Sequence, residues 1–298
     1  MNDNTTPLVS VVIPTYNHAR YLRRALQSVV DQTYTNWQAI VIDNHSKDNT
    51  DEVMQRFTDP RITYLKIHNN GVIAASRNVG MRAAKGEWIA FLDSDDWWTS
   101  DKLKTCCESI NDEVDLIYHD LQIISDQPRF LRQNQIKSWQ LKPHVLIDLM
   151  ERGNAIATSS AVVRAKLLMQ LNGMNESPDM IAAEDYNTWL RIAQVTKKFK
   201  YVSKRLGFYQ LHNQGISQKD MSIPVKYAVA DFIYILNTAQ KNKFLANLKY
   251  TKGRFEYLAG NTAIAKQNLH FSLRHGQISV KLKSVMMLIN VIAMRLLK

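Results

Sequence analysis

Hydrophobic and polar positions divide this chain of 298 residues into blocks that predict strands and helices in alternation. Short runs rich in Val, Ile and Leu, each closed by polar residues, are typical of strands buried on both faces of a sheet. Apolar residues that recur every three or four positions follow several of these runs and predict helices with one buried face. The strand-like runs are residues 8–13, 39–43, 62–67, 88–92, 114–124, 155–163 and 206–211.

Helical periodicity fills the intervals between these runs. The predicted helices cover residues 22–30, a stretch that begins near residue 51, and residues 72–84, 102–110 and 184–193. Strands and helices that alternate at this spacing favour a parallel sheet with helices on both faces, and therefore the α/β class. Residues 126–143 are polar, contain two prolines and are predicted to form a loop that could cover a site.

Residues 222–298 are predicted to form a helical extension of a domain at residues 1–221. Gly253, Gly260 and Gly276 are expected at turns between its helices. The stretch after Gly260 is similar to part of one tetratricopeptide-like repeat, a unit that needs stacked neighbours to be stable.

The formal net charge of +11 is concentrated in this extension, where residues 241–298 hold 11 Lys and Arg side chains and one acid, Glu256. Residues 285–294 are mostly apolar, with basic residues on both sides. Such a segment suits a helix that lies on an anionic membrane surface, and it also suits a helix that packs on the preceding helices. The rest of the chain is balanced in charge, and we expect no nucleic-acid partner.

The composition is that of an ordinary globular protein in a reducing compartment. Cys106 and Cys107 are adjacent on a predicted helix, where they are poorly placed to bridge each other. No basic segment followed by an apolar core marks a secretory signal, and no apolar run approaches the roughly 20 residues of a spanning helix. We therefore expect a cytoplasmic protein, at the inner face of the cytoplasmic membrane if the extension binds there.

Three acids, Asp93, Asp95 and Asp96, follow the strand predicted at residues 88–92. In open α/β sheets, ligands bind beyond the carboxyl ends of the strands. Clustered carboxylates repel one another unless a cation lies among them, and their oxygens suit Mg²⁺ or Mn²⁺ that carries substrate phosphates. The structural alternative is a solvated acidic turn that caps a helix before Trp97.

Taken in order, several motifs make the sequence resemble an inverting family-2 glycosyltransferase of the GT-A fold. The matching stretches are residues 11–17, 42–48, 75–80, 86–96 and 184–191. The resemblance covers roughly residues 8–217. It implies a Rossmann-like, mostly parallel sheet sandwiched by helices, followed by a small all-α extension.

In this family, the loop after the first strand and the acid after the second strand hold the nucleotide of a nucleotide-sugar donor. The resemblance assigns donor binding to Pro14, Thr15, Tyr16, Asn17, Asp43, Arg77, Asp93 and Ser94. Asp43 can accept from an N–H of uracil or from a ribose hydroxyl, and a UDP-sugar is the expected donor. Asn44 and His45 depart from the family pattern and weaken the inference about the base. The structural alternatives are that Thr15 and Asn17 cap the first helix and that Arg77 forms an ion pair.

The resemblance also assigns a divalent cation, Mn²⁺ or Mg²⁺, to Asp95, with His212 as a second ligand. The cation would offset negative charge on the departing diphosphate. Gln210 stands where family members often have Arg, which predicts one cationic contact fewer for the diphosphate. The alternative for His212 is an exposed loop histidine.

Asp185 resembles the catalytic base of the family. In a transfer with inversion, an acceptor hydroxyl attacks the anomeric carbon from the side opposite the diphosphate while a carboxylate takes its proton. The N terminus of the predicted helix favours the ionised carboxylate. The structural alternative is that Glu184 and Asp185 are ordinary first-turn acids.

The acceptor side carries few signals. Glu184, Trp139 and Trp97 are the candidate acceptor contacts, although Trp side chains are at least as often packing residues. By resemblance, the acceptor is a carbohydrate or a lipid-linked sugar. The process would be the synthesis of cell-surface polysaccharide, lipopolysaccharide or glycan.

Other classes fit the sequence less well. A nucleotidyltransferase would have a Gly-rich, basic loop after the first strand, where this chain has residues 14–18, and a dinucleotide-dependent enzyme would have Gly-x-Gly-x-x-Gly there. An inactive scaffold that binds a nucleotide sugar is disfavoured because Asp93, Asp95 and Asp185 are all present.

Overall fold

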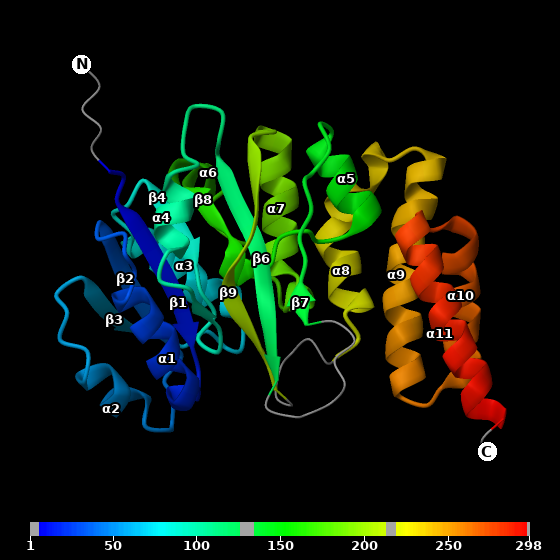
Figure 1. The fold of residues 1–298 in the computed structure, drawn as a ribbon, viewed down its shortest axis with the longest axis horizontal. Coiled ribbons are helices and arrows are strands. Elements are labelled where there is room, and N and C mark those ends of the chain that lie inside the picture. Colours follow the sequence, from blue (N-terminus) through cyan, green and yellow to red (C-terminus); the bar gives the residue numbers. More distant parts are fainter. Residues whose placement is uncertain (1–5, 126–133, 213–218, 297–298) are drawn as a thin grey trace.

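The computed structural model describes residues 6–125, 134–212 and 219–296 of the chain. Its described residues form a nine-stranded sheet with helices on both sides and a group of helices at one end (Figure 1). In spatial order, the strands are β3 (Ile62–Lys66), β2 (Trp37–Asp43), β1 (Val9–Thr15), β4 (Trp88–Phe91), β8 (Val162–Arg164), β6 (Leu116–Ser125), β9 (Phe199–Leu211) and β5 (Trp97–Trp98), while β7 (Gln135–Ile136) pairs with β6.

The first half of the sheet is parallel, and the second half is mixed. β3, β2, β1 and β4 pair in parallel, so that Thr15 lies opposite Asp43 where β1 and β2 end. β8 runs antiparallel to both β4 and β6, whereas β6 and β9 are parallel. The predicted α/β class is confirmed. β1 continues through Pro14 and Thr15, two residues beyond the predicted strand.

β1, β2 and β4 are buried on both faces because helices cover both, whereas the edge strand β3 is only partly buried. Val11 and Ile13 of β1 pack in one core cluster with α1 (Ala19–Val30), and Val12 packs in the other with α3 (Ile73–Ala83). α3 approaches the sheet closely at Gly80, where a Cβ atom would lie 2.6 Å from Ile42 and Val12. The remaining helices of this part are α2 (Thr50–Gln55), α4 (Lys102–Cys107), α5 (Val145–Arg152), α6 (Ala165–Gln170) and α7 (Glu184–Val195).

The strand predicted at residues 155–163 is wrong for most of its length. A 3₁₀ helix, Thr158–Ser160, occupies its centre, and only the short strand β8 follows. The hydroxyl of Ser160 donates to the carbonyl of Ala157 at 2.7 Å. This local hydrogen bond favours the 3₁₀ turn over an extended strand. Of the loop predicted at 126–143, residues 126–133 lie outside the described residues, and β7 forms within the rest.

The predicted helical extension consists of α8 (Ser222–Val229), a 3₁₀ helix (Ala230–Ile235), α9 (Thr238–Leu258), α10 (Thr262–His275) and α11 (Ile278–Leu296). Ala228, Val229 and Phe232 join the larger core, so the interior continues across residue 221. A separate small cluster that includes Leu269 and Leu288 holds the last three helices together.

Gly253 does not form the predicted turn. It lies inside α9, where a Cβ atom would be 3.0 Å from the side chain of Leu269, so the glycine serves close packing of α9 on α10. Gly260 has a φ of +84° and does form the turn between these two helices. Among the described residues, no helix is both long and apolar enough to cross a membrane.

Candidate active site

The predicted site residues come together where the parallel strands end. Thr15, Asp43, Asp93 and His212 follow or end β1, β2, β4 and β9. β6 and β9 end at the lower edge of the molecule in Figure 1, and Asp185 is the second residue of α7, the helix that precedes β9 in the chain. Residues far apart in the sequence therefore share one edge of the sheet.

Arg77 joins the two halves of this site. Its guanidinium donates from Nη2 to Oδ1 of Asp93 at 2.6 Å and from Nη1 to Oε1 of Glu184 at 2.5 Å. Burial of Arg77 opposes its charge, but the two carboxylates outweigh this effect and raise its pKa above the ordinary value. The ion pair left open by the sequence is present: Arg77 and Glu184 are almost fully buried, whereas Asp93 is partly exposed. Such a pair fixes geometry more than it adds stability.

Asp185 lies beside this ion pair and is partly exposed. Its Oδ2 accepts from the hydroxyl of Thr158 at 3.0 Å and from the amide of Asn154 at 3.2 Å. Burial and the neighbouring Glu184 charge raise the pKa of Asp185 to about 7. These effects exceed the helix N-terminal effect expected from the sequence, so the carboxylate titrates near neutral pH.

Asp95 and His212 approach each other at the end of β9. Oδ2 of Asp95 lies 2.9 Å from Nε2 of His212, and the ring of Tyr21 stacks on the histidine with centroids 5.3 Å apart. Oδ1 of the buried Asp96 accepts from the backbone N–H of Gln210 at 3.0 Å. The side chain of Asp96 therefore fixes the acidic turn to β9, whereas Asp95 faces a histidine.

Arg24 is a residue of this site that the sequence did not reveal. Its Nη2 donates to Oε1 of Gln210 at 2.9 Å and to the carbonyl of Asp95 at 3.3 Å. The guanidinium lies 3.3 Å from the centroid of the Trp97 ring, which stacks in turn on Phe208. The sequence predicts that Gln210, in place of an Arg, removes a positive charge from the site. Arg24 of α1 supplies a positive charge beside Gln210.

The loop after β1 binds the loop after β2 instead of capping a helix. Asn17 adopts a φ of +52°, accepts from the N–H of Lys47 through its side chain at 2.7 Å and donates its own N–H to Ser46 at 2.8 Å. The N–H of Ala19, at the start of α1, donates to Oδ2 of Asp48 at 2.9 Å, so Asp48 and not Asn17 binds the helix start and the capping alternative for Asn17 is wrong. The hydroxyl of Thr15 is buried and has no hydrogen-bond partner within the described residues.

The remaining donor candidates differ in accessibility. Tyr16 is 48% exposed, whereas Asp43 is fully buried and already accepts from Ser46 and from the hydroxyl of Tyr64. Pro14 is buried within β1, and the buried Ser94 lies 3.0 Å from Nδ1 of His18 through its hydroxyl.

Two exposed histidines lie at the same edge, after β2 and β3. The rings of His45 and His68 stack with centroids 3.8 Å apart and an interplanar angle of 15°. His45 occupies the position where the sequence departs from the family pattern, and it has a φ of +51°. The contact between His45 and His68 could not be predicted from the neighbouring residues, because it depends on the parallel register of β2 and β3.

The candidate acceptor residues are partly engaged in internal contacts. Trp97 lies between Arg24 and Phe208, and Glu184 is bonded to Arg77. Trp139 packs beneath the guanidinium of Arg152, 4.6 Å from its ring centroid.

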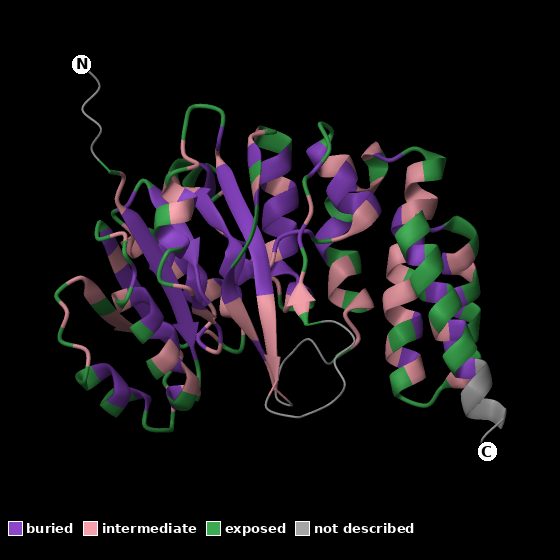
Figure 2. Ribbon diagram, in the orientation of Figure 1, coloured by how far each residue is buried: buried purple, intermediate pink, exposed green. Residues whose placement is uncertain are grey.

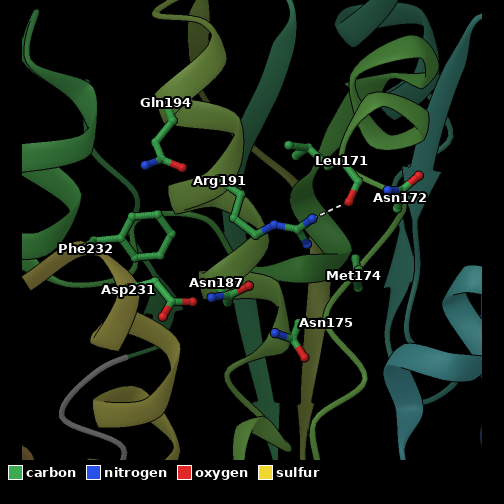
Figure 3. A pocket seen from close by; sticks show the side chains of 9 residues that line it. All are labelled: Leu171, Asn172, Met174, Asn175, Asn187, Arg191, Gln194, Asp231 and Phe232. Carbon is green, nitrogen blue, oxygen red and sulfur yellow. Dashed lines mark hydrogen bonds between the residues drawn. The ribbon is translucent and has the colours of Figure 1, made fainter.

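A cavity of about 440 Å³ lies elsewhere, on the side of α7 that faces the turn at residues 171–175 (Figure 3). None of the predicted site residues lines it. Arg191 donates to the carbonyls of Leu171 and Gly173, and Asn187 donates to the carbonyl of Ala228 at 2.9 Å. These polar groups join α7 to its neighbours, so we place the chemistry at the acidic edge and not in this cavity.

Comparison with known proteins identifies the family of the chain. The model of the family described as "Glycosyl transferase family 2" matches residues 10–167. UDP-Glc:alpha-D-GlcNAc-diphosphoundecaprenol beta-1,3-glucosyltransferase WfgD of Escherichia coli is 30% identical over 187 residues, which cover 62% of this chain and 69% of that protein. Putative teichuronic acid biosynthesis glycosyltransferase TuaG of Bacillus subtilis is 40% identical over 103 residues, which cover 34% of this chain and 41% of that protein.

Solved structures show the same fold. The crystal structure of S. aureus TarS 1-349 in complex with UDP-GlcNAc has a TM-score of 0.65 and 18% identity, covering 95% of this chain and 88% of that one. Mannosyltransferase PcManGT from Pyrobaculum calidifontis, in complex with GDP-Man and Mn²⁺, has a TM-score of 0.64 and 18% identity, covering 98% and 81%. The predicted fold is confirmed, and with the family model matching more than half of its length, the chain belongs to glycosyl transferase family 2.

Proposed function

We propose that this glycosyltransferase moves a sugar from a UDP-sugar to a hydroxyl of a lipid-linked sugar acceptor, with inversion at the anomeric carbon. The observation that carries the proposal is the buried bridge through Arg77, which holds Asp93 at the donor side and Glu184, next to Asp185, in one rigid unit. A displacement reaction needs its donor and its base held at a fixed separation.

Asp185 is the proposed base. The acceptor O–H bond breaks as the oxygen attacks the anomeric carbon, the bond from that carbon to the diphosphate oxygen breaks, and Asp185 receives the proton. Thr158 and Asn154 hold one carboxylate oxygen and orient the side chain. Its pKa of about 7 suits proton transfer near neutral pH, because a base works best when its pKa lies near the working pH.

Asp95 and His212 are the proposed metal ligands. No group of three or more His, Cys, Asp or Glu side chains in the described ranges could hold a metal ion alone. A carboxylate and an imidazole at one point nevertheless fit Mn²⁺ or Mg²⁺, since such ions take one or two protein ligands and complete their shell with substrate phosphates and water. A bound cation would stabilise negative charge on the leaving diphosphate.

The proposed donor contacts are the loop at residues 14–17, with Asp43, Asp93 and Ser94 beside it. Tyr16 is exposed and supplies a surface on which a base can stack, whereas the hydroxyl of Thr15 is buried beneath this loop without a hydrogen-bond partner in the described residues. The complexes of TarS with UDP-GlcNAc and of PcManGT with GDP-Man support a nucleotide sugar as the donor class.

A lipid-linked acceptor and a role in polysaccharide synthesis are proposed from the relatives. WfgD is named for a diphosphoundecaprenol-linked acceptor, and TuaG for teichuronic acid biosynthesis. Glu184, Trp97 and Trp139 remain the proposed acceptor contacts.

The test is transfer from a panel of UDP-, GDP- and dTDP-sugars with Mn²⁺ to a diphosphate-lipid sugar acceptor. We expect release of a nucleoside diphosphate together with glycosylated acceptor, and loss of both with Asp185→Asn. Asp179→Asn is the control, because Asp179 is an exposed acid on the segment that precedes α7. Formation of a nucleoside triphosphate and a sugar 1-phosphate from the donor when pyrophosphate is added would identify a nucleotidyltransferase, and normal turnover by Asp185→Asn would exclude Asp185 as the base.

A further inference from the structure

α11 carries apolar side chains on two different faces. The first face is buried and includes Val280, Leu288 and Val291, which pack towards α9 and α10. The other face is exposed. Its apolar side chains, with their exposed fractions, are Ile278 at 78%, Leu282 at 62%, Val285 at 39%, Met286 at 46% and Ile289 at 60%.

These five exposed residues form a continuous row, which we call the α11 stripe. Their spacing of three and four positions places them along one side of the helix, and Figure 2 shows exposed segments along α11. Packing on the preceding helices therefore accounts for one face of α11 and leaves the stripe without a described partner. Contiguous exposed apolar surface of this kind marks an interaction site.

Charge identifies the kind of surface that fits the stripe. Lys281 and Lys283 are exposed on either side of it. Glu256, the single acid among residues 241–298, is 6% exposed, and its Oε1 lies 2.7 Å from Nζ of Lys252. The face around the stripe thus combines apolar side chains with positive charge that no acid of the same segment offsets.

We propose that the α11 stripe inserts into the surface of an anionic lipid bilayer, with Lys281 and Lys283 at the level of the head groups. An amphipathic helix with a basic border binds in this way, through apolar burial together with attraction to anionic lipids. A second copy of the chain is a poorer partner, because a two-fold pairing of stripes would bring the same lysines together.

Attachment through α11 would bring the chain to the surface that holds a lipid-linked acceptor. This use of the contact rests on the proposed function, whereas the contact itself does not.

The test is flotation of the full chain with phosphatidylcholine vesicles that contain phosphatidylglycerol, without donor or acceptor. Leu282→Glu/Ile289→Glu places two acids in the stripe. Met169→Glu/Val195→Glu is the matched control, because it makes the same change in charge at two apolar residues that are each 44% exposed on other helices. Thermal melting of both variants checks that they fold.

We expect the wild-type chain to float at low salt, to float less at high salt, and to bind vesicles of pure phosphatidylcholine weakly. The stripe variant should bind at least tenfold more weakly than the matched control. Equal binding by the two variants, or no binding by the wild type, would overturn the proposal. A wild-type dimer that the stripe variant converts to monomers, without vesicle binding, would show that a second copy covers the stripe.

Discussion

Arg24 of α1 donates its Nη2 to Oε1 of Gln210 near the end of β9, at 2.9 Å. The same guanidinium donates to the carbonyl of Asp95, so the positive charge is held against the acidic turn. A hydrogen bond that involves a charged group contributes roughly 1.5–3 kcal/mol, and we expect Arg24→Gln to lower kcat/KM for the donor about tenfold to a hundredfold.

Exchanging the two side chains tests the position of this charge. Gln210→Arg alone places two guanidinium groups side by side and should also lower kcat/KM, whereas Arg24→Gln/Gln210→Arg should recover most of the loss. Steady-state kinetics with varied donor give the three values. A double variant no better than Arg24→Gln would show that Arg24 acts through its packing on Trp97 and not through its charge.

Asp95→Ala should make activity insensitive to Mn²⁺ and lower it by orders of magnitude, because stabilisation of the leaving diphosphate by a cation contributes several kcal/mol. Activity measured against Mn²⁺ concentration, with and without EDTA, checks this. Asp112→Ala is a control at an exposed acid remote from the site. Full activity of Asp95→Ala in EDTA would rule out the metal role.

The pH profile should report Asp185. The base acts only when ionised, so kcat/KM should rise as pH increases through about 7, the pKa to which burial and Glu184 raise this carboxyl group. The hydroxyl of Thr158 stabilises the ionised form, and Thr158→Val should therefore move this limb to higher pH. A limb that stays in place in Thr158→Val would assign the titration to another group.

Lys102→Met should stabilise the fold. Lys102 is fully buried, has no hydrogen-bond partner for Nζ within the described ranges, and lies 3.6 Å from the centroid of the Trp98 ring. Burial lowers its pKa from 10.5 to about 8, which corresponds to about 3 kcal/mol of unfavourable free energy for the charged form. We expect Lys102→Met to raise the free energy of unfolding at pH 7 by about 1–3 kcal/mol.

The pH dependence separates this effect from simple repacking. The folded protein releases the Lys102 proton near pH 8 and the unfolded chain near pH 10.5, so wild-type stability should gain from this group as pH rises between those values. Urea unfolding at pH 7 and pH 10 should show a difference between wild type and Lys102→Met that shrinks with pH. A constant difference would point to packing alone.

The sequence predicts the parallel half of the fold well because its inner strands β2, β1 and β4 are buried on both faces. Runs such as residues 39–42 and 88–92 must then be apolar throughout, and an acid that follows them stands out. Residues 155–163 mislead for the opposite reason, since the hydroxyls of Thr158 and Ser160 form local and site contacts that no apolar pattern encodes.

The acids of the site can also be predicted from the sequence, but the side chains that contact them can be predicted only in part. Arg24 occupies an ordinary polar position of an amphipathic helix, and its bond to Gln210 joins residues 186 positions apart. The two faces of α11 are hidden in a similar way. A helix with apolar residues on two faces does not reveal which of them the neighbouring helices will cover.

The buried bridge through Arg77 also constrains how the chain reaches its active state. Arg77 and Glu184 are 107 positions apart, and Asp95 and His212 are 117 positions apart. The parallel half can pair as soon as β4 is available, but contacts this distant in sequence form late, after long segments have been closed. During synthesis, Asp95 therefore reaches its partner His212 only after most of the domain has been made. Transfer activity consequently requires the complete domain to fold, and partly folded chains should show no activity in a transfer assay.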